Sequence, residues 1–282
     1  MLNFGISFNK LNHRNTMTPG YYLLGSIIGD ISGSIYEFHN IRTTDFELKN
    51  PESHFTDDTV LTIAIADALL HNKDFTSYVR NWGQKYVGAG YGGHFIGWLL
   101  NRDAGPYNSW GNGSAMRVSA VGYYAQSLQE AMQLAENTAS ITHNHPEGIK
   151  GAEATAAAIY LARTGESKEY IRDFIEWKIG YDLHTRTCDE IRPTYKFNES
   201  CQGTVPEAII AFLESTDYVN AIKLAISLGG DSDTLAAITG GIAHAYYKHI
   251  PEDIIAWAMD CLPEDMRKVI TAFDEECQVK MT

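Results

Sequence analysis

Two short acidic clusters, far apart in the chain, carry the residue types of a single metal-binding site. The first spans Thr56–Thr59 (TDDT), and the second spans Asp231–Thr234 (DSDT) directly behind Gly229-Gly230. Each has two carboxylates with flanking hydroxyls and leads into an apolar, alanine-rich segment. If the fold brings them together, four negative charges share one pocket, which is costly unless cations fill it. All-oxygen ligation favours Mg²⁺, Mn²⁺ or Ca²⁺ over Zn²⁺.

Either cluster alone is also typical of a helix start, because Thr, Ser and Asp are favoured at N-caps. Thr56 is the expected N-cap of a helix that runs to Leu70, with Asp57 and Asp58 in its first turn. The metal interpretation is favoured because both clusters open helices that are too apolar to lie on the surface. Buried carboxylates need counter-ions, and a pair of metal ions would supply them.

A third motif, Gly111–Arg117 (GNGSAMR), is a glycine-rich turn that enters a predicted helix. Its backbone amides are suited to a phosphate or a sugar, although it lacks the lysine of a Walker loop. A tight turn with Ser114 as N-cap is an equally weighted alternative. Arg117 is a candidate to pair with a carboxylate of the site.

Two histidines precede another predicted helix in Thr142–Gly148 (THNHPEG). A zinc site is one interpretation, but no cysteine or HExxH pattern supports it. A capping or hydrogen-bonding role is more typical of a histidine here, and His143 would be a natural donor beside a sugar-phosphate pocket. Glu37 ends the first predicted helix, where a carboxylate opposes the helix dipole and needs another reason to be present.

The elements that position these residues are predicted to be helices. Leucine and isoleucine residues recur at helical spacing over Tyr21–Tyr36. Gly25, Gly29 and Gly33 are spaced by four, which lets another backbone come close. Further helices are predicted at 56–70, 75–87, 113–125, 128–140, 147–163, 167–178, 205–214, 217–227, 233–247, 251–260 and 264–277.

Only Thr43–Leu48 and Tyr195–Phe197 show a weak strand pattern. The predicted fold is therefore all-α, a compact single-domain bundle of many helices over 18–282. Residues 1–17 are polar and are predicted to be a weakly ordered arm. The longest irregular stretch, 180–203, is expected to be functional because long loops in compact domains often are.

Composition limits the classes of partner. The chain has 282 residues with 44% hydrophobic content, enough to bury a full core. Its net charge of −13 gives no general attraction to nucleic acid or anionic membranes, so neither is an expected partner. Four cysteines without a CxxC pair predict free thiols in a cytoplasmic protein. No stretch approaches the roughly 18 apolar residues of a membrane span.

Taken in order, these motifs resemble the ADP-ribosylglycohydrolases, a family that includes the dinitrogenase-reductase-activating glycohydrolase and an eye-lens crystallin relative. The matching pieces begin with Gly25–Asp30 and Glu37, followed by the first acidic cluster and GNGSAMR. The fourth piece is Thr142-His143, and the fifth is the second acidic cluster with the Gly240–Ala243 (GGIA) stretch that ends it. Each piece is weak alone, but five in the family's order make a specific pattern over residues 20–250.

The resemblance implies a compact all-α fold with two Mg²⁺ or Mn²⁺ ions in a cleft, and hydrolysis of the bond between ADP-ribose and an acceptor. The implied metal ligands are Thr56, Asp57, Asp58, Asp231, Asp233 and Thr234. The implied catalytic residues are Glu37, Asp57 and Asp58. The implied contacts to ADP-ribose are Asn112, Gly113, Ser114, Met116 and His143. Metal-bound water would attack the anomeric carbon after Glu37 or an aspartate takes its proton.

The expected partner is an ADP-ribosylated protein or a small-molecule ADP-ribose conjugate, with an arginine linkage as the first hypothesis. Serine-linked, nucleic-acid-linked and small-molecule ADP-ribose remain alternatives within the same enzyme class. A non-catalytic ADP-ribose-binding protein is the alternative from another class. Both acidic clusters are intact, which argues against the loss of activity implied by the lens relative.

Overall fold

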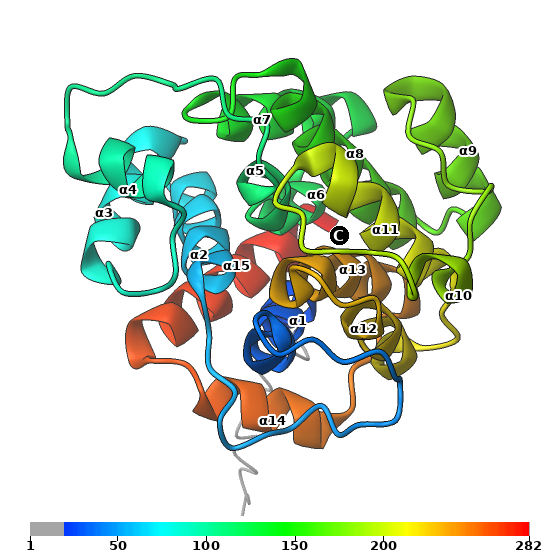
Figure 1. The fold of residues 1–282 in the computed structure, drawn as a ribbon. Helices are drawn as coiled ribbons and strands as arrows, with labels where there is room; N and C mark the ends of the chain where they lie inside the picture. The colour runs from blue at the N-terminus through cyan, green and yellow to red at the C-terminus, as the bar shows by residue number, and fades with distance from the viewer. Residues whose placement is uncertain (1–19, 282) are drawn as a thin grey trace, which may run out of the picture.

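The two helices at the centre of the molecule are α1 and α13, and the other helices surround them (Figure 1). The computed structural model describes residues 20–281. The helices are α1 (Leu24–Gly33), α2 (Asp57–Leu70), α3 (Phe75–Lys85), α4 (Gly93–Leu100), α5 (Gly113–Met116), α6 (Ser119–Tyr124), α7 (Leu128–Ser140), α8 (Pro146–Thr164), α9 (Lys168–Ile179), α10 (Cys188–Ile191), α11 (Cys201–Glu214), α12 (Tyr218–Ser227), α13 (Ser232–Tyr247), α14 (Glu252–Asp260) and α15 (Glu264–Met281). A 3₁₀ turn, η1 (Ser34–Tyr36), follows α1.

The all-α prediction is confirmed, and the two weak strand candidates are wrong. Thr43–Leu48 and Tyr195–Phe197 are irregular, and the described residues contain one isolated bridge, between Gly111 and Ser200. Neither candidate is paired with another segment in the described part of the chain, and two-residue alternation needs a partner strand to become a sheet.

Several helix boundaries differ from the prediction. The helix predicted at 113–125 is two short helices, α5 and α6. The helix predicted at 205–214 begins at Cys201, where Ser200 caps it by accepting from the Gly203 amide at 3.2 Å. Pro206 therefore lies inside α11 rather than at its start. The short helices α4 and α10 were not predicted, because eight and four residues carry little periodicity.

The glycine row of α1 lets this helix lie directly on the backbone of α13. A β-carbon built at Gly29 would lie 2.1 Å from the carbonyl oxygen of Ala236, and one at Gly33 would lie 2.5 Å from the Cα of Asp233. The predicted close approach of a second backbone is thus confirmed. It brings the C-terminal end of α1 beside the first turn of α13, where the second acidic cluster lies.

The helices enclose one continuous hydrophobic core. α2 and α13 are buried on nearly every face, as their apolar sequences predict. All four cysteines are free, as expected. The arm predicted over 1–17 lies outside the described residues.

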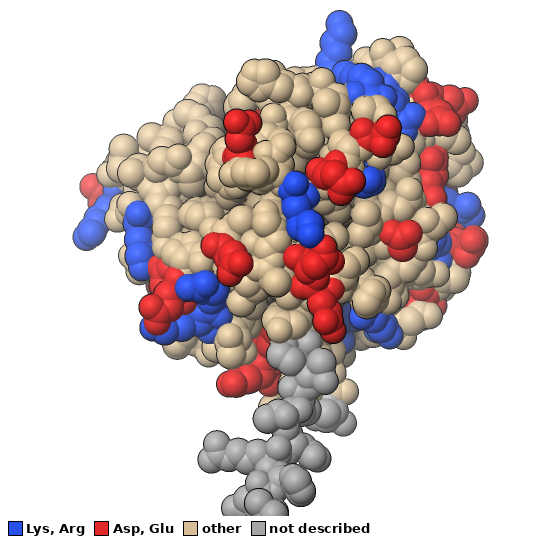
Figure 2. Space-filling view, turned by 90° about the horizontal axis from the view of Figure 1, so that it is seen from below, with Lys and Arg blue, Asp and Glu red and all other residues tan. Residues whose placement is uncertain are grey.

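Charged side chains of both signs are interspersed on the face shown in Figure 2, without a large patch of one sign. Within residues 20–281, no helix combines the length and the apolar content needed to cross a membrane. The cytoplasmic location remains a prediction.

Candidate active site

The fold brings the two acidic clusters into one cavity of about 270 Å³. Asp57 and Asp58 reach it from the N-terminus of α2, and Asp231 and Asp233 reach it from the N-terminus of α13. The hydroxyl of Thr234 donates to Oδ2 of Asp58 at 3.3 Å, which joins the two clusters directly. Residues 176 positions apart thus share one hydrogen bond.

Two groups of three carboxylates lie in the cavity and share Asp233. Asp30, Asp58 and Asp233 form one, and Glu37, Asp231 and Asp233 form the other. In each group the three ligand oxygens lie within 4.8 Å of one another. Two overlapping sets of oxygen ligands are what a pair of neighbouring divalent cations requires.

The carboxylates of this cavity are short of partners. Asp58 is 2% exposed, and its Oδ1 is buried without a hydrogen bond. Burial raises the pKa values of Asp57, Asp58 and Asp233 well above their usual range, and repulsion from neighbouring carboxylates raises them further. A cation in the cavity would reverse both effects, since it would stabilise the ionised forms.

Arg117 does not supply that cation, so its predicted pairing with a site carboxylate is wrong. Its guanidinium is fully buried and donates from Nη2 to the carbonyl of Thr138 and the hydroxyl of Thr142, both at 2.8 Å. Among the described residues that line the cavity, Arg117 is the only arginine or lysine. The aspartates therefore have no fixed counter-charge.

Asp30 is a site residue to which the sequence interpretation gave no role. It is fully buried on α1 and accepts from the amide and hydroxyl of Thr56 at 2.9 and 2.6 Å. The amide of Thr59 donates to it at 3.1 Å, and the Thr59 hydroxyl donates as well. These bonds fasten the start of α2 to α1. The signal was available, because Asp30 is the only charged residue on an apolar helix.

Thr56 caps α2 as predicted, with its hydroxyl accepting from the amide of Asp58 at 3.4 Å. Asp231 occupies the N-cap position of α13 but makes no side-chain cap bond. Its Oδ2 instead accepts from Nδ2 of Asn112 at 2.6 Å, and Nδ2 also lies 3.1 Å from the hydroxyl of Thr204. Asn112 therefore orients a carboxylate, whereas the sequence interpretation made it a substrate contact.

Glu37 lies directly after η1 and lines the cavity. Burial raises its pKa to about 7, with further contributions from Asp231 and Asp30. The following loop is tied to the second cluster through Asn40, which donates to the carbonyl of Gly230 at 2.8 Å and accepts from its amide at 2.7 Å. Gly230 has a φ of +76°, which favours glycine at this turn.

The glycine-rich turn forms another wall of the cavity. Gly113 and Met116 line it, and the Met116 sulfur lies 4.0 Å from the Thr234 hydroxyl. Ser114 points away, because its buried hydroxyl donates to the carbonyl of Gly148 at 2.6 Å. A ligand contact from Ser114 would have to come from its backbone.

The two histidines of the THNHPEG motif separate. His143 lines the cavity beside Gly113, and burial and then Arg117 lower its pKa well below the usual range. His145 caps α8, as its Nδ1 accepts from the Glu147 amide at 3.1 Å. No zinc-type pair forms from them.

The sequence analysis did not identify all the residues that line the cavity. The sequence analysis assigned no ligand contact between residues 89 and 110, where much of this wall lies. The lining residues outside the predicted motifs are Leu61, Gly90, Gly92, Gly93, His94, Phe95, Tyr107, Ser109 and Glu199. The density of glycine over 88–93 (GAGYGG) was the available signal.

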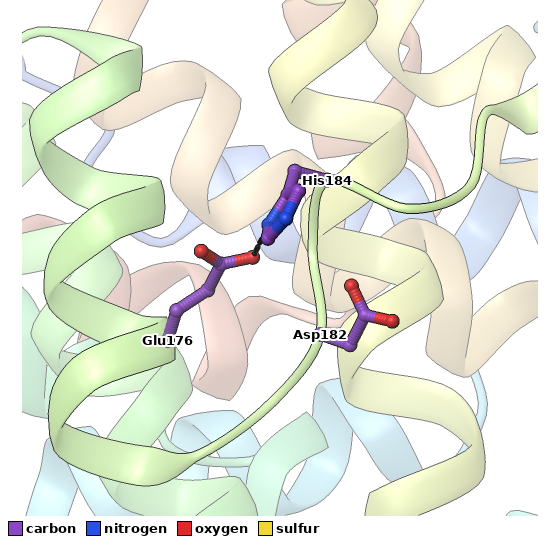
Figure 3. A group of neighbouring side chains, drawn as sticks. All are labelled: Glu176, Asp182 and His184. Carbon is purple, nitrogen blue, oxygen red and sulfur yellow. Dashed lines mark hydrogen bonds and ion pairs between the residues drawn. The ribbon is translucent and has the colours of Figure 1, made fainter.

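Glu176, Asp182 and His184 form a third group of ligand-type side chains within 4.8 Å, on α9 and the loop behind it. In Figure 3 the Glu176 carboxylate faces the imidazole of His184, and Asp182 lies to one side. Glu176 pairs with Nδ1 of His184 at 2.5 Å and accepts from the Leu183 amide at 2.9 Å. Asp182 accepts from the amide of Thr185 at 3.2 Å. These hydrogen bonds hold the three side chains in place, so their arrangement does not require a bound metal.

Known proteins of similar sequence or structure match most of this chain. ADP-ribosylhydrolase ARH3 of Mus musculus is 27% identical over 85% of this chain and 86% of its own. ADP-ribosylarginine hydrolase Tri1 of Pseudomonas putida is 27% identical over 80% of this chain and 69% of its own. A solved structure titled "ADP-ribosylglycohydrolase-related protein complex" superposes with a TM-score of 0.69 at 24% identity, covering 92% of this chain and 97% of the other. That likeness shows a shared fold.

The family model described as ADP-ribosylglycohydrolase matches residues 22–280. The match includes both acidic clusters and every helix from α1 to α14. The chain therefore belongs to the ADP-ribosylglycohydrolase family and is a glycosidic-bond hydrolase.

Proposed function

We propose that this protein uses two divalent cations, Mg²⁺ or Mn²⁺, to hydrolyse the bond that joins ADP-ribose to an acceptor. Thr56, Asp57, Asp58, Asp231, Asp233 and Thr234 would hold the cations. The observation that carries the proposal is the shared position of Asp233 in two groups of carboxylates, beside a buried Asp58 oxygen without a partner. Such a site is unfavourable when empty and ionised, and favourable when cations occupy it.

When bound, the cations would polarise ribose hydroxyls and lower the pKa of a water beside the anomeric carbon. Side chains of this protein would carry out the proton transfer and orient the water. Glu37 would accept the proton of the attacking water, because its carboxylate lines the cavity beside the second acidic cluster and bound cations would keep it ionised. Asp57 and Asp58, fixed in the first turn of α2, would orient that water. Asp30 would keep Thr56 in place.

The glycine-rich turn and His143 would hold the ADP-ribose part. Gly113 presents its backbone to the cavity, whereas the Gly111 amide already donates to the Ser109 hydroxyl at 3.1 Å. Uncharged donors suit an anionic pyrophosphate in an acidic protein, since no basic patch is then needed. Asn112 contributes indirectly, through the orientation of Asp231.

The first test is release of ADP-ribose from a defined substrate in Mg²⁺ or Mn²⁺, with and without chelator. Asp57→Ala and Asp233→Ala are expected to abolish release while circular dichroism shows the fold retained. Chelator is expected to abolish release by the unaltered protein. Full activity in either variant would overturn the metal-pair assignment.

The acceptor is proposed to be an arginine side chain, with an ADP-ribosylated protein as the substrate. The similarity to ADP-ribosylarginine hydrolase Tri1 supports this choice, whereas the similarity to ARH3 hydrolases does not specify a linkage. Peptides carrying arginine-linked and serine-linked ADP-ribose, assayed side by side with a nucleic-acid conjugate, would decide it. Faster release from any conjugate other than arginine would replace this part of the proposal. Tight binding of ADP-ribose without turnover of any conjugate would favour a non-catalytic binding protein.

A further inference from the structure

The feature that the proposed mechanism leaves unused is a chain of hydrogen bonds behind His143. Arg117 is fully buried, and Nη2 is its one nitrogen with a hydrogen-bond partner. A guanidinium can only donate, so the Thr142 hydroxyl oxygen has to accept from it. The same oxygen lies 2.7 Å from Nδ1 of His143.

These contacts determine where the imidazole proton lies. No other acceptor among the described residues faces the Thr142 hydroxyl hydrogen. If Nδ1 carried the proton, that buried hydrogen would have no acceptor, which costs about 1–3 kcal/mol. The Thr142 hydroxyl therefore donates to an unprotonated Nδ1, and the single proton of a neutral ring lies on Nε2.

The Nε2 atom faces the cavity. A β-carbon built at Gly113 would lie 3.1 Å from Nε2, and one built at Gly111 would lie 3.4 Å from it. Nε2 has no hydrogen-bond partner among the described residues, although His143 is only 5% exposed. Burial and the nearby Arg117 lower the pKa of this histidine, so the ring stays neutral at physiological pH.

We propose that Thr142, held in place by Arg117, is a positioning residue that fixes His143 as a neutral Nε2–H donor. The donor is directed at an acceptor oxygen of the bound ADP-ribose. The positive charge of Arg117 acts indirectly, because its guanidinium donates to the Thr142 hydroxyl and thereby sets the direction of the hydrogen bond to His143. This inference deepens the proposed function, and its substrate-binding part rests on that function.

The tautomer can be measured without any assumption about activity. Protein labelled with ¹⁵N-histidine, with Mg²⁺ present, gives long-range ¹H–¹⁵N NMR spectra that report the state of each ring nitrogen. The chain has ten histidines, so the His143 signals are assigned from their loss in His143→Gln. The expected result is a protonated Nε2 and an unprotonated, hydrogen-bonded Nδ1. A protonated Nδ1 in the unaltered protein would overturn the proposal.

Thr142→Val tests the positioning role, because it removes the hydroxyl and keeps the shape. The Nδ1 signal is expected to move toward that of a free acceptor, and calorimetry is expected to show about tenfold weaker binding of free ADP-ribose. Thr142→Ser is expected to restore both values. Thr155→Val is the matched control, because its buried hydroxyl donates to the Gly151 carbonyl at 3.0 Å, outside this chain of bonds.

The two measurements separate the possible failures. An unchanged Nδ1 signal in Thr142→Val would overturn the role of Thr142. A changed signal with unchanged ADP-ribose affinity would overturn the contact between His143 and the ligand. If the unaltered protein does not bind ADP-ribose at all, the proposed function fails, and the NMR result still decides the tautomer.

Discussion

The cavity carboxylates and the Glu176–Asp182–His184 group both place three ligand-type side chains within 4.8 Å, yet their surroundings differ. In the group on α9 and the loop behind it, the His184 and Glu176 side chains are 63% and 22% exposed, and hydrogen bonds account for their positions. In the cavity, Asp58 and Asp233 are 2% and 4% exposed, and an Asp58 oxygen has no partner. Proximity of ligands is common, whereas burial without compensation creates a demand for a cation.

The difference also appears in the titration of the two groups. The hydrogen bond with Glu176 raises the pKa of His184, so this pair holds a proton more firmly and needs no metal. In the cavity, burial raises the pKa values of the aspartates with no basic partner to offset it. The following experiments test whether this contrast is functional.

The largest effect is expected from Asp233→Asn, which alters the carboxylate shared by both groups in the cavity. We expect kcat/KM to fall about a thousandfold, because both cation positions lose a charged ligand. Steady-state release of ADP-ribose in Mg²⁺ measures it. Glu176→Gln is the control from the exposed group. A comparable fall in kcat/KM of that variant would show that the two groups do not differ in function.

The next largest effect is expected from Glu37→Gln. Removal of the proposed base should lower kcat about a hundredfold and affect KM less. In the unaltered protein, activity should rise with pH as Glu37 loses its proton, and the midpoint should lie below the metal-free pKa of about 7, because bound cations stabilise the ionised form. A pH–rate profile compares the two proteins. A variant with unchanged kcat would remove Glu37 from the mechanism.

Metal binding should stabilise the fold measurably. At Mg²⁺ concentrations about 100 times the dissociation constant, binding to the native state alone adds about 2.7 kcal/mol to the free energy of unfolding. Urea unfolding in Mg²⁺ and in chelator measures this difference in the free energy of unfolding. Asp58→Asn should lose most of this gain, whereas His184→Gln should keep it. Equal stability of the unaltered protein in both buffers would contradict the proposed site.

Without metal, stability should fall as pH rises. The buried carboxyls have raised pKa values in the native state, Glu37 to about 7, whereas those of an unfolded chain titrate near 4. Between these values the native state binds more protons, so the free energy of unfolding decreases with pH. This contribution is complete below about pH 4 and is lost as pH passes 7. Unfolding curves in chelator at pH 5.5 and 8 measure it, and saturating Mg²⁺ should abolish the decline.

The smallest effect is expected from His184→Gln in the exposed group. The free energy of unfolding should change by less than about 0.5 kcal/mol, as is usual for surface substitutions, and kcat should not change. Thermal unfolding and the release assay check this. A marked loss of Mg²⁺-dependent activity would show that the exposed group also holds a functional cation.

Local patterns were predicted well because short-range physics determines them. The positions of most helices follow from apolar periodicity, and Thr56 caps α2 as its residue type favours. The hydrogen-bond partners of Ser114 and Arg117 could not be predicted in this way. Each uses its polar atoms on a backbone carbonyl from a distant helix, Gly148 and Thr138, which no local pattern specifies.

The sequence by itself determined the helical class, the two acidic clusters and the glycine row of α1 that lets another backbone come close. Only the tertiary structure decided that Asp30 fastens the start of α2 to α1 and that Asn112 orients Asp231. The physical reason is that helix formation depends on neighbours within one turn. The partners of a buried polar group are instead set by the packing of α1, α2, α8 and α13 against one another.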